Sequence, residues 1–156
     1  AKRAENVIAL EEAFSVEGLN KVPKTNEWPI PIDPQIMETW ATRLRDFEEW
    51  RLPEMEAHEV TVHVLSTAPG IQAVPDAPTA TANAKKANDY LAAVIAKYPD
   101  RFRGFAALPL QDLEAAVQEL KRWAKELGFC GALVNDHTLG HYLDEPQFGA
   151  FWLGKN

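Results

Sequence analysis

The chain has 156 residues, of which 46% are hydrophobic and 25% charged, a composition typical of one ordinary globular domain with its own core. Its formal net charge of −7 argues against nucleic acid or an anionic membrane as a partner. No apolar stretch approaches the roughly 20 residues that a membrane span needs, and the basic start AKRAEN is not followed by the apolar region of a signal peptide. The single cysteine excludes an internal disulfide, and we therefore expect a cytoplasmic protein.

Strand-like and helix-like segments alternate along the chain. Short runs rich in β-forming residues lie at 7–10, 60–66, 102–108 and 129–134. Apolar residues recur at helical spacing within 36–47, 84–98 and 113–127. Asp112 is the expected N-cap of the third helix and Gly128 its C-terminal glycine, and Pro146 indicates the start of a fourth helix. This β-α alternation predicts a parallel sheet with right-handed crossovers.

Two parallel architectures fit this order. An open doubly wound sheet has no support as a nucleotide-binding fold, because no GxGxxG or GxxxxGK[ST] motif follows a strand. A (β/α)8 barrel typically needs about 250 residues, so four β/α units make half of one. We expect a single domain over 1–156, with a proline-rich first loop at 15–33 that is long enough to cover a site.

Polar segments follow the predicted strands, where parallel α/β folds bind their ligands. They read LEEAF, STAPG, LPLQD and VNDHTLGHYLDEP. Within the first, the adjacent Glu11 and Glu12 must point to opposite faces of a regular strand. A carboxylate that faces the interior is costly unless it is paired or holds a metal.

Several segments together resemble the metal-dependent aromatic acid decarboxylases of the amidohydrolase superfamily, and the dihydroxybenzoate decarboxylases in particular. The segments are IALEEAF, LSTAPGIQ, NDYLAAVIAKYPDRFRGFAALPLQD, LGFCGALVNDHT and YLDEPQFGAFW. They occur in the order and spacing of that family and cover the N-terminal half of such an enzyme. The resemblance implies an α/β fold of the (β/α)8 TIM-barrel type, of which this chain holds about the first four β/α units.

The resemblance also implies roles for the EEAF residues. Glu11 matches a ligand of a divalent metal, which would be Zn, Mn or Mg, and Glu12 matches a structural partner that faces away. Ala13 stands where many members have a second histidine ligand. Regular alternation would place it on the same face as Glu11, beside the metal. Some decarboxylases of the family also read EEAF, whereas water-activating hydrolases of the superfamily usually have a His-x-His pair here.

Further residues match the wall of the substrate pocket in that family. Thr67, Ala68 and Pro69 match the segment after the second strand, although STAPG by itself is also a typical turn sequence. Asn135 matches a residue that can donate a hydrogen bond to a phenol or carboxylate oxygen, although Asn-Asp after a strand is also common in loops and caps.

The four histidines and the cysteine carry weaker signals. His137 and His141 have a metal-like spacing, but Gly140 between them indicates a loop, so we expect His137 to contact the pocket and keep metal ligation as an alternative. We expect His63 to be a hydrogen-bonded core residue and His58 to be exposed. Cys130, which lies in the run FCGALV, is expected to be a small buried hydrophobic residue. That makes His137 the only histidine placed at the substrate.

The function implied by the resemblance is reversible, non-oxidative decarboxylation of a hydroxylated aromatic acid such as a dihydroxybenzoate. The family's further histidine ligand and the aspartate that donates the proton fall outside this chain, so the chain alone should not turn over. The alternatives are a hydrolase of a lactone or amide from the same superfamily, or a non-catalytic half-barrel that assembles with a partner chain. Uncovered strand edges predict a homo-oligomer or association with the missing half-barrel.

Overall fold

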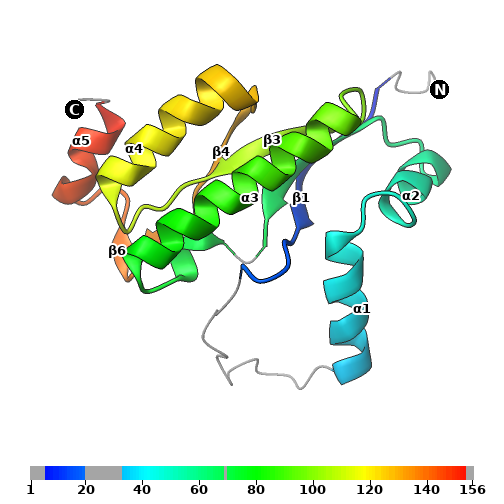
Figure 1. Cartoon of the computed structure of the whole chain (residues 1–156), viewed down its shortest axis with the longest axis horizontal. Helices are drawn as coiled ribbons and strands as arrows, with labels where there is room; N and C mark the ends of the chain where they lie inside the picture. Colours follow the sequence, from blue (N-terminus) through cyan, green and yellow to red (C-terminus); the bar gives the residue numbers. More distant parts are fainter. Residues whose placement is uncertain (1–5, 20–32, 69, 154–156) are drawn as a thin grey trace.

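Four parallel strands form one open sheet in the order β1-β2-β3-β4 (Figure 1). This arrangement is seen in a computed structural model that describes residues 6–19, 33–68 and 70–153. The strands are β1 (Ile8–Phe14), β2 (Val62–Thr67), β3 (Phe102–Ala107) and β4 (Gly131–Leu133). The predicted parallel sheet is therefore confirmed, with β1 and β4 as its edges.

Helices lie between the strands and after the last one. They are α1 (Pro34–Arg45), α2 (Arg51–Ala57), α3 (Ala77–Lys97), α4 (Leu113–Arg122) and α5 (Gly149–Trp152), with one π-helical turn at Trp123–Leu127 and short 3₁₀ turns at Ile71–Ala73 and Pro146–Phe148. The long helix α3 crosses the sheet and packs on β3, with α4 beside it (Figure 1). Within the described ranges, none of these helices is long and apolar enough to cross a membrane.

The main core lies between the sheet and α3. Phe14 of β1, Leu65 of β2 and Phe102 of β3 are almost fully buried there together with Leu91 of α3. Each such side chain contributes about 1.5–3 kcal/mol by leaving water. A Cβ atom at Gly104 would lie 2.7 Å from Cδ2 of Leu91, so the absence of a side chain at this position lets α3 approach β3 closely.

The ends of the third predicted helix form as the sequence indicates. The Asp112 carboxylate accepts a hydrogen bond from the Ala115 amide at 3.0 Å, which is the expected N-cap. Gly128 has φ +65, the left-handed conformation that commonly ends a helix. Both predictions are confirmed, although the last turn before Gly128 is a π turn rather than α-helix.

One helix was predicted over 36–47, but the chain between β1 and β2 has two helices: α1, which ends at Arg45, and α2, which begins at Arg51. The Asp46 carboxylate accepts hydrogen bonds from the backbone amides of Glu49 at 3.2 Å and Trp50 at 2.7 Å. These bonds form a turn between the end of α1 and the start of α2. Side-chain acceptors of this kind compete with a continuous helix. The second helix was therefore missed in the sequence.

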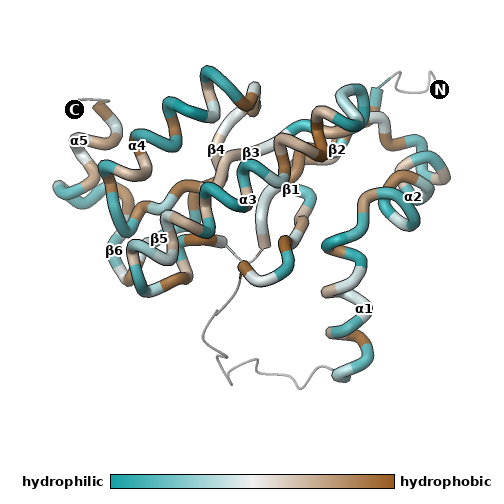
Figure 2. The backbone as a smooth tube through the Cα atoms, viewed as in Figure 1, coloured by the Kyte–Doolittle hydropathy of each residue, from teal (hydrophilic) through white to brown (hydrophobic). Residues whose placement is uncertain are grey.

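The apolar stripe of that segment does not form the core face that its spacing predicts. Ile36, Met37 and Trp40 are exposed, and α1 has no buried residue. The reason is geometric, because α1 extends away from the sheet (Figure 1) and carries hydrophobic and hydrophilic residues along an uncovered length (Figure 2). Only Phe47, beyond the end of α1, is buried in the main core.

The segment after β4 forms a small hairpin that the sequence reading placed in a loop. Strands β5 (His137–Thr138) and β6 (His141–Tyr142) pair antiparallel. The two residues between them have positive φ, 53° at Leu139 and 84° at Gly140, as a type I′ turn requires. Beyond the hairpin, Phe148 and Phe151 are buried against α4, whereas Trp152 of the predicted fourth helix is exposed.

One of the predictions for His58, His63 and Cys130 is confirmed, and two are wrong. His58 is exposed, as predicted. His63 is half-buried, but its Nδ1 is buried without a hydrogen-bond partner in the described structure, so the prediction of a satisfied core histidine was wrong at this atom. The prediction of a buried Cys130 was also wrong: the residue is exposed, and its Sγ donates to the Gly104 carbonyl at 3.3 Å on the rim of the sheet.

Burial of His63 makes the stability of the fold depend on pH. Burial lowers the pKa of His63 below its ordinary value of 6.5, so the unfolded chain takes up a proton at a higher pH than the folded chain does. Stability that is present above pH 6.5 is therefore lost as the pH falls through 6.5 toward the lower folded pKa. In urea titrations across this range, His63→Gln should flatten the decline, while the exposed-site control His58→Gln should retain it. Equal slopes for the two variants would contradict the assignment.

Candidate functional site

The carboxyl-terminal half of β1 contains a β-bulge. Ala9 pairs with His63 and Glu12 with Leu65, so β1 has one residue more than β2 between these two pairs. Within this stretch Glu11 has φ +63, in the left-handed region that non-glycine residues seldom adopt. A bulge changes the direction of a side chain, and bulges are frequent next to active sites.

Glu11 offers an uncommitted carboxylate at the ligand-binding end of the sheet. Its side chain is exposed and makes no hydrogen bond or ion pair with any described residue. Regular alternation would place Glu11 and Ala13 on the same face, but the bulge interrupts that alternation at Glu11. Ala13 does pair with Ser66, and its neighbour Phe14 lies in the core under α3. Ala13 therefore faces the side of the sheet opposite to α3.

Glu12 has different surroundings. It is half-buried and alternates with Ala13, which places it on the helix-covered side together with Phe14. Burial lowers the pKa of Arg51 and of His63, and in both cases the negative charge of Glu12 is the largest opposing cause. The two adjacent carboxylates thus have separate environments: Glu11 is exposed at the strand end, and Glu12 lies near the partly buried Arg51 and His63.

A narrow cleft, with room for only about 10 Å³, lies at the carboxyl ends of β2, β3 and β4. Its lining includes two of the predicted substrate residues, Thr67 and Asn135, and also Gly70, Gln72, Phe105 and Leu133. A Cβ atom at Gly70 would lie 2.5 Å from Nδ2 of Asn135, so this position must lack a side chain for the asparagine to occupy its place. The cleft presents amide and hydroxyl groups on an otherwise apolar wall.

Two glutamines that the sequence analysis did not select fix the cleft. Gln72, only 5% exposed, accepts a hydrogen bond from the backbone amide of Asn135 at 2.8 Å and donates to the Thr138 hydroxyl at 3.0 Å. Gln111 donates to the carbonyls of Ile71 at 2.8 Å and Val74 at 2.6 Å. The signal that could have revealed them is a lone amide side chain inside the apolar strings GIQAV and LPLQD at strand ends.

The other predicted substrate residues lie outside this cleft. Ala68 is half-buried, and its amide donates to the Phe14 carbonyl at 2.8 Å, which joins the end of β2 to the end of β1. His137 is exposed on the hairpin, where its Nδ1 accepts from the Gly140 amide at 3.3 Å. Pro69 and most of the predicted covering loop, 20–32, lie outside the described residues.

The hairpin histidines do not form a metal site with each other. His141 is bound to Glu145, with Nδ1 and Oε2 3.0 Å apart, and this contact is the main cause that lowers the pKa of Glu145. Across residues 6–19, 33–68 and 70–153, no three His, Cys, Asp or Glu side chains come together as metal ligands. A metal held at Glu11 would need its other ligands from outside this part of the chain.

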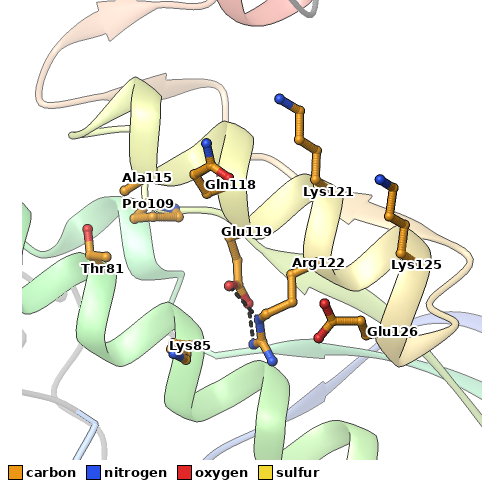
Figure 3. A pocket seen from close by; sticks show the side chains of 10 residues that line it. All are labelled: Thr81, Lys85, Pro109, Ala115, Gln118, Glu119, Lys121, Arg122, Lys125 and Glu126. Atoms are coloured by element: carbon orange, nitrogen blue, oxygen red, sulfur yellow. Dashed lines mark hydrogen bonds and ion pairs between the residues drawn. The ribbon is translucent and has the colours of Figure 1, made fainter. Parts of the chain in front are cut away.

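A larger groove lies between α3 and α4, away from the strand ends. It encloses about 540 Å³, and Lys121 and Lys125 point away from it (Figure 3). Arg122 and Glu119 fill its centre, with Nη2 and Oε1 2.6 Å apart (Figure 3). Glu119 also accepts from the buried Asn88 at 2.7 Å. These groups satisfy one another, so the groove is a helix contact and not part of the candidate site.

The same network holds the end of β3 in place. The Asn88 side chain donates to the Ala107 carbonyl at 3.0 Å and accepts from the Ala107 amide at 2.9 Å. Ala107 lines the cleft. The buried asparagine of α3 therefore links the cleft wall to the charged pair on α4.

Comparison with known proteins defines the class to which this sheet and strand-end site belong. The sequence pattern of the amidohydrolase family matches residues 24–152, and the chain belongs to that family. Its solved relatives are barrels of the amidohydrolase superfamily, which confirms the predicted fold class, and the described sheet corresponds to about half of such a barrel.

Individual relatives are aromatic acid decarboxylases. The chain is 42% identical to γ-resorcylate decarboxylase of Rhodococcus jostii (strain RHA1) over 160 residues, which cover 93% of this chain and 46% of that protein. A 2,6-dihydroxybenzoate decarboxylase solved with 2,6-dihydroxybenzoate aligns with a TM-score of 0.83 and 40% identity over 97% of this chain and 47% of that one.

A further structural relative carries a metal. The dihydroxybenzoic acid decarboxylase of Polaromonas sp. JS666, solved with bound manganese and the inhibitor 2-nitroresorcinol, aligns with a TM-score of 0.83 and 39% identity. It is covered to 46%, and this chain to 96%. The chain thus spans about half the length of the relatives that it matches.

Gln72 should be required for the order of the cleft. Gln72→Leu keeps the side-chain volume but leaves the backbone amide of Asn135 and the Thr138 hydroxyl without this partner, which should cost about 1–3 kcal/mol of unfolding free energy. Amide hydrogen exchange should accelerate at residues 135–138. The matched control is Gln118→Leu on the exposed side of α4. Unchanged exchange at 135–138 in Gln72→Leu would show that Gln72 does not hold the cleft.

Proposed function

We propose that this chain forms the N-terminal half of a barrel enzyme that decarboxylates a hydroxylated aromatic acid without oxidation, and reversibly. The observation that carries the proposal is the uncommitted Glu11 carboxylate at the bulged carboxyl end of β1. The substrate class is supported by the dihydroxybenzoate decarboxylases at 40–42% identity. The domain proposed for 1–156 is this half-barrel, with a long first loop at 15–33.

The proposed cofactor is a divalent metal held in part by Glu11. A carboxylate oxygen suits Mn²⁺ or Mg²⁺ and is also a ligand for Zn²⁺. Manganese is favoured because it is bound in the relative from Polaromonas. When bound, the metal would supply Lewis-acid chemistry and a template for the substrate's charged oxygens. The remaining ligands and the proton donor are proposed to come from the C-terminal half.

Some of the residues proposed to contact the substrate are small and apolar and leave room for its ring, and others offer hydrogen-bonding groups. Ala13 leaves room beside Glu11 on the face opposite to α3, and Ala68, just after β2, adds an apolar contact. Pro69, predicted as a further contact, lies outside the described residues. Thr67 and Asn135 present a hydroxyl and an amide at the cleft, and Asn135 can donate to a phenol or carboxylate oxygen. These contacts orient the ring.

His137 is proposed as a substrate contact from the hairpin side rather than from the cleft. It is exposed, and its Nδ1 already accepts a hydrogen bond from Gly140, so its Nε2 is the nitrogen available to a substrate oxygen. In this arrangement His137 orients the substrate and is not proposed as a metal ligand.

An assembly partner is also part of the proposal. Val7 just before the edge strand β1, and Ile8 and Leu10 within it, are exposed, and β4 forms the other open edge. Open strand edges with apolar residues need cover. We propose that a C-terminal half-barrel, or a second copy of this chain, provides it. A cytoplasmic location stays a prediction from the single cysteine.

The two glutamates allow a matched test of the function. The chain is combined with the C-terminal half of the Rhodococcus jostii relative, and bound Mn²⁺ and carbon dioxide released from 2,6-dihydroxybenzoate are measured. Glu11→Gln should lose bound metal and lower the rate on the order of a thousandfold, since a metal contributes several kcal/mol to the transition state. Glu12→Gln should lose about 1–3 kcal/mol of unfolding free energy but keep its metal.

The isolated 156-residue chain is the negative control and should release no carbon dioxide. Equal metal content in Glu11→Gln and the unsubstituted assembly would end the ligand assignment. Product from a lactone or amide, without decarboxylation, would instead favour the hydrolase alternative.

A further inference from the structure

Arg51, at the start of α2, reaches across to the end of β1. Its Nη2 donates a hydrogen bond to the Ala13 carbonyl at 2.6 Å. The next carbonyl, that of Phe14, accepts from Ala68 after β2 and therefore faces that strand. Because successive carbonyls of a strand point to opposite sides, the Ala13 carbonyl faces the open edge of β1, where the described sheet offers no ladder partner. Arg51 satisfies it there.

The Arg51 side chain packs against the core, and its buried Nε has no hydrogen-bond partner among the described residues. Its guanidinium carbon lies 5.4 Å from the centroid of the Phe47 ring, which is buried in the main core. Burial lowers the pKa of Arg51, and the charges of Glu12 and Asp46 oppose this effect. An arginine keeps its charge in such a place and presents a planar set of donors, so its bond to a carbonyl is charge-assisted and directional.

This contact lies two residues from the strained position. A non-glycine residue in the left-handed region is strained and persists only where its surroundings fix it. On one side, the ladder to β2 fixes Glu12, Ala13 and Phe14. On the other side, the fixed points are Arg51 at the Ala13 carbonyl and the Leu44 carbonyl, which accepts from the Ser15 amide at 2.9 Å. The bulge is thus held from both edges.

We propose that Arg51 is a positioning residue for Glu11: by fixing the Ala13 carbonyl from the open edge of β1, it aims the Glu11 carboxylate at the metal. The inference rests on the proposed function, since it assumes that Glu11 binds a cation. Arg51 touches neither metal nor substrate. It acts through the backbone between Glu11 and Ala13.

A matched arginine elsewhere in the chain separates positioning from general stability. Arg101 also holds backbone carbonyls, with Nη2 on Val60 and Nε on Thr61, both at 3.1 Å, but it does so before β2, at the amino end of the sheet. The expectation is that Arg51→Met and Arg101→Met both lower the unfolding free energy, whereas only Arg51→Met changes cation binding at Glu11.

The measurement is Mn²⁺-induced broadening of amide NMR signals in the ¹⁵N-labelled chain, combined with the unlabelled C-terminal half of the Rhodococcus jostii relative. The signals are followed at residues 9–14 and at remote carboxylates as a reference. Arg51→Met should weaken the apparent Mn²⁺ affinity at 9–14 by about tenfold, the lower end of the loss caused by removing groups that support metal ligands. Arg101→Met should leave it within twofold. If Arg51→Met does not fold, Arg51→Gln, which is too short to reach Ala13, replaces it with the same expected outcome.

Glu11→Gln in the same titration distinguishes the two levels of the proposal. If it abolishes the broadening at 9–14 and Arg51→Met weakens it as expected, both stand. If it abolishes the broadening while Arg51→Met and Arg101→Met behave alike, the positioning role is overturned and the proposed function stands. If Glu11→Gln leaves the broadening unchanged, the metal assignment fails and the role of Arg51 fails with it.

Discussion

The packing of α3 against one face of the parallel sheet is the contact on which the rest of this structure depends. Leu91 enters the space left by Gly104, and Phe14 and Phe102 close the core around it. This packing fixes strands that are far apart in the sequence side by side and in the same direction. Their carboxyl ends therefore meet along one edge, which brings the polar residues after β1, β2 and β4 to the same end of the sheet.

Buried polar groups then fix the details of that edge. Asn88 ties the end of β3 to the charged pair on α4, and Gln72 ties the loop after β2 to the residues after β4. Arg51 does the same for β1 from its open side. Each of these side chains satisfies a backbone group at or near the end of a strand, so these backbone groups do not stay unpaired.

Features determined by short-range chemistry were predictable from the sequence, and features determined by distant contacts were not. Asp112 and Gly128 mark the ends of α4 and its π turn because caps depend on neighbouring residues alone. The apolar stripe of α1 was misleading because a stripe does not reveal what covers it. The β5–β6 turn was hidden because Leu139, rather than asparagine or glycine, occupies a position with positive φ.

The candidate site shows the same division. Resemblance to a decarboxylase family was enough to select Glu11, Thr67 and Asn135, since those positions stand in recognisable strings. It did not reveal the bulge at Glu11, because a period of two in the sequence contains no sign of an extra residue in one strand. Nor did it reveal Gln72 or Arg51, whose partners lie 63 and 38 residues away in the chain.

Anomalous diffraction at the manganese edge would show which side chain holds the metal. We propose Glu11, and not Glu12 or the hairpin histidines. The crystals would contain this chain assembled with the C-terminal half of a relative, in the presence of Mn²⁺. We expect one strong anomalous peak at bonding distance from a Glu11 carboxylate oxygen, on the side of the sheet opposite to α3. A peak bound by Glu12, His137 or His141, with Glu11 free, would contradict it.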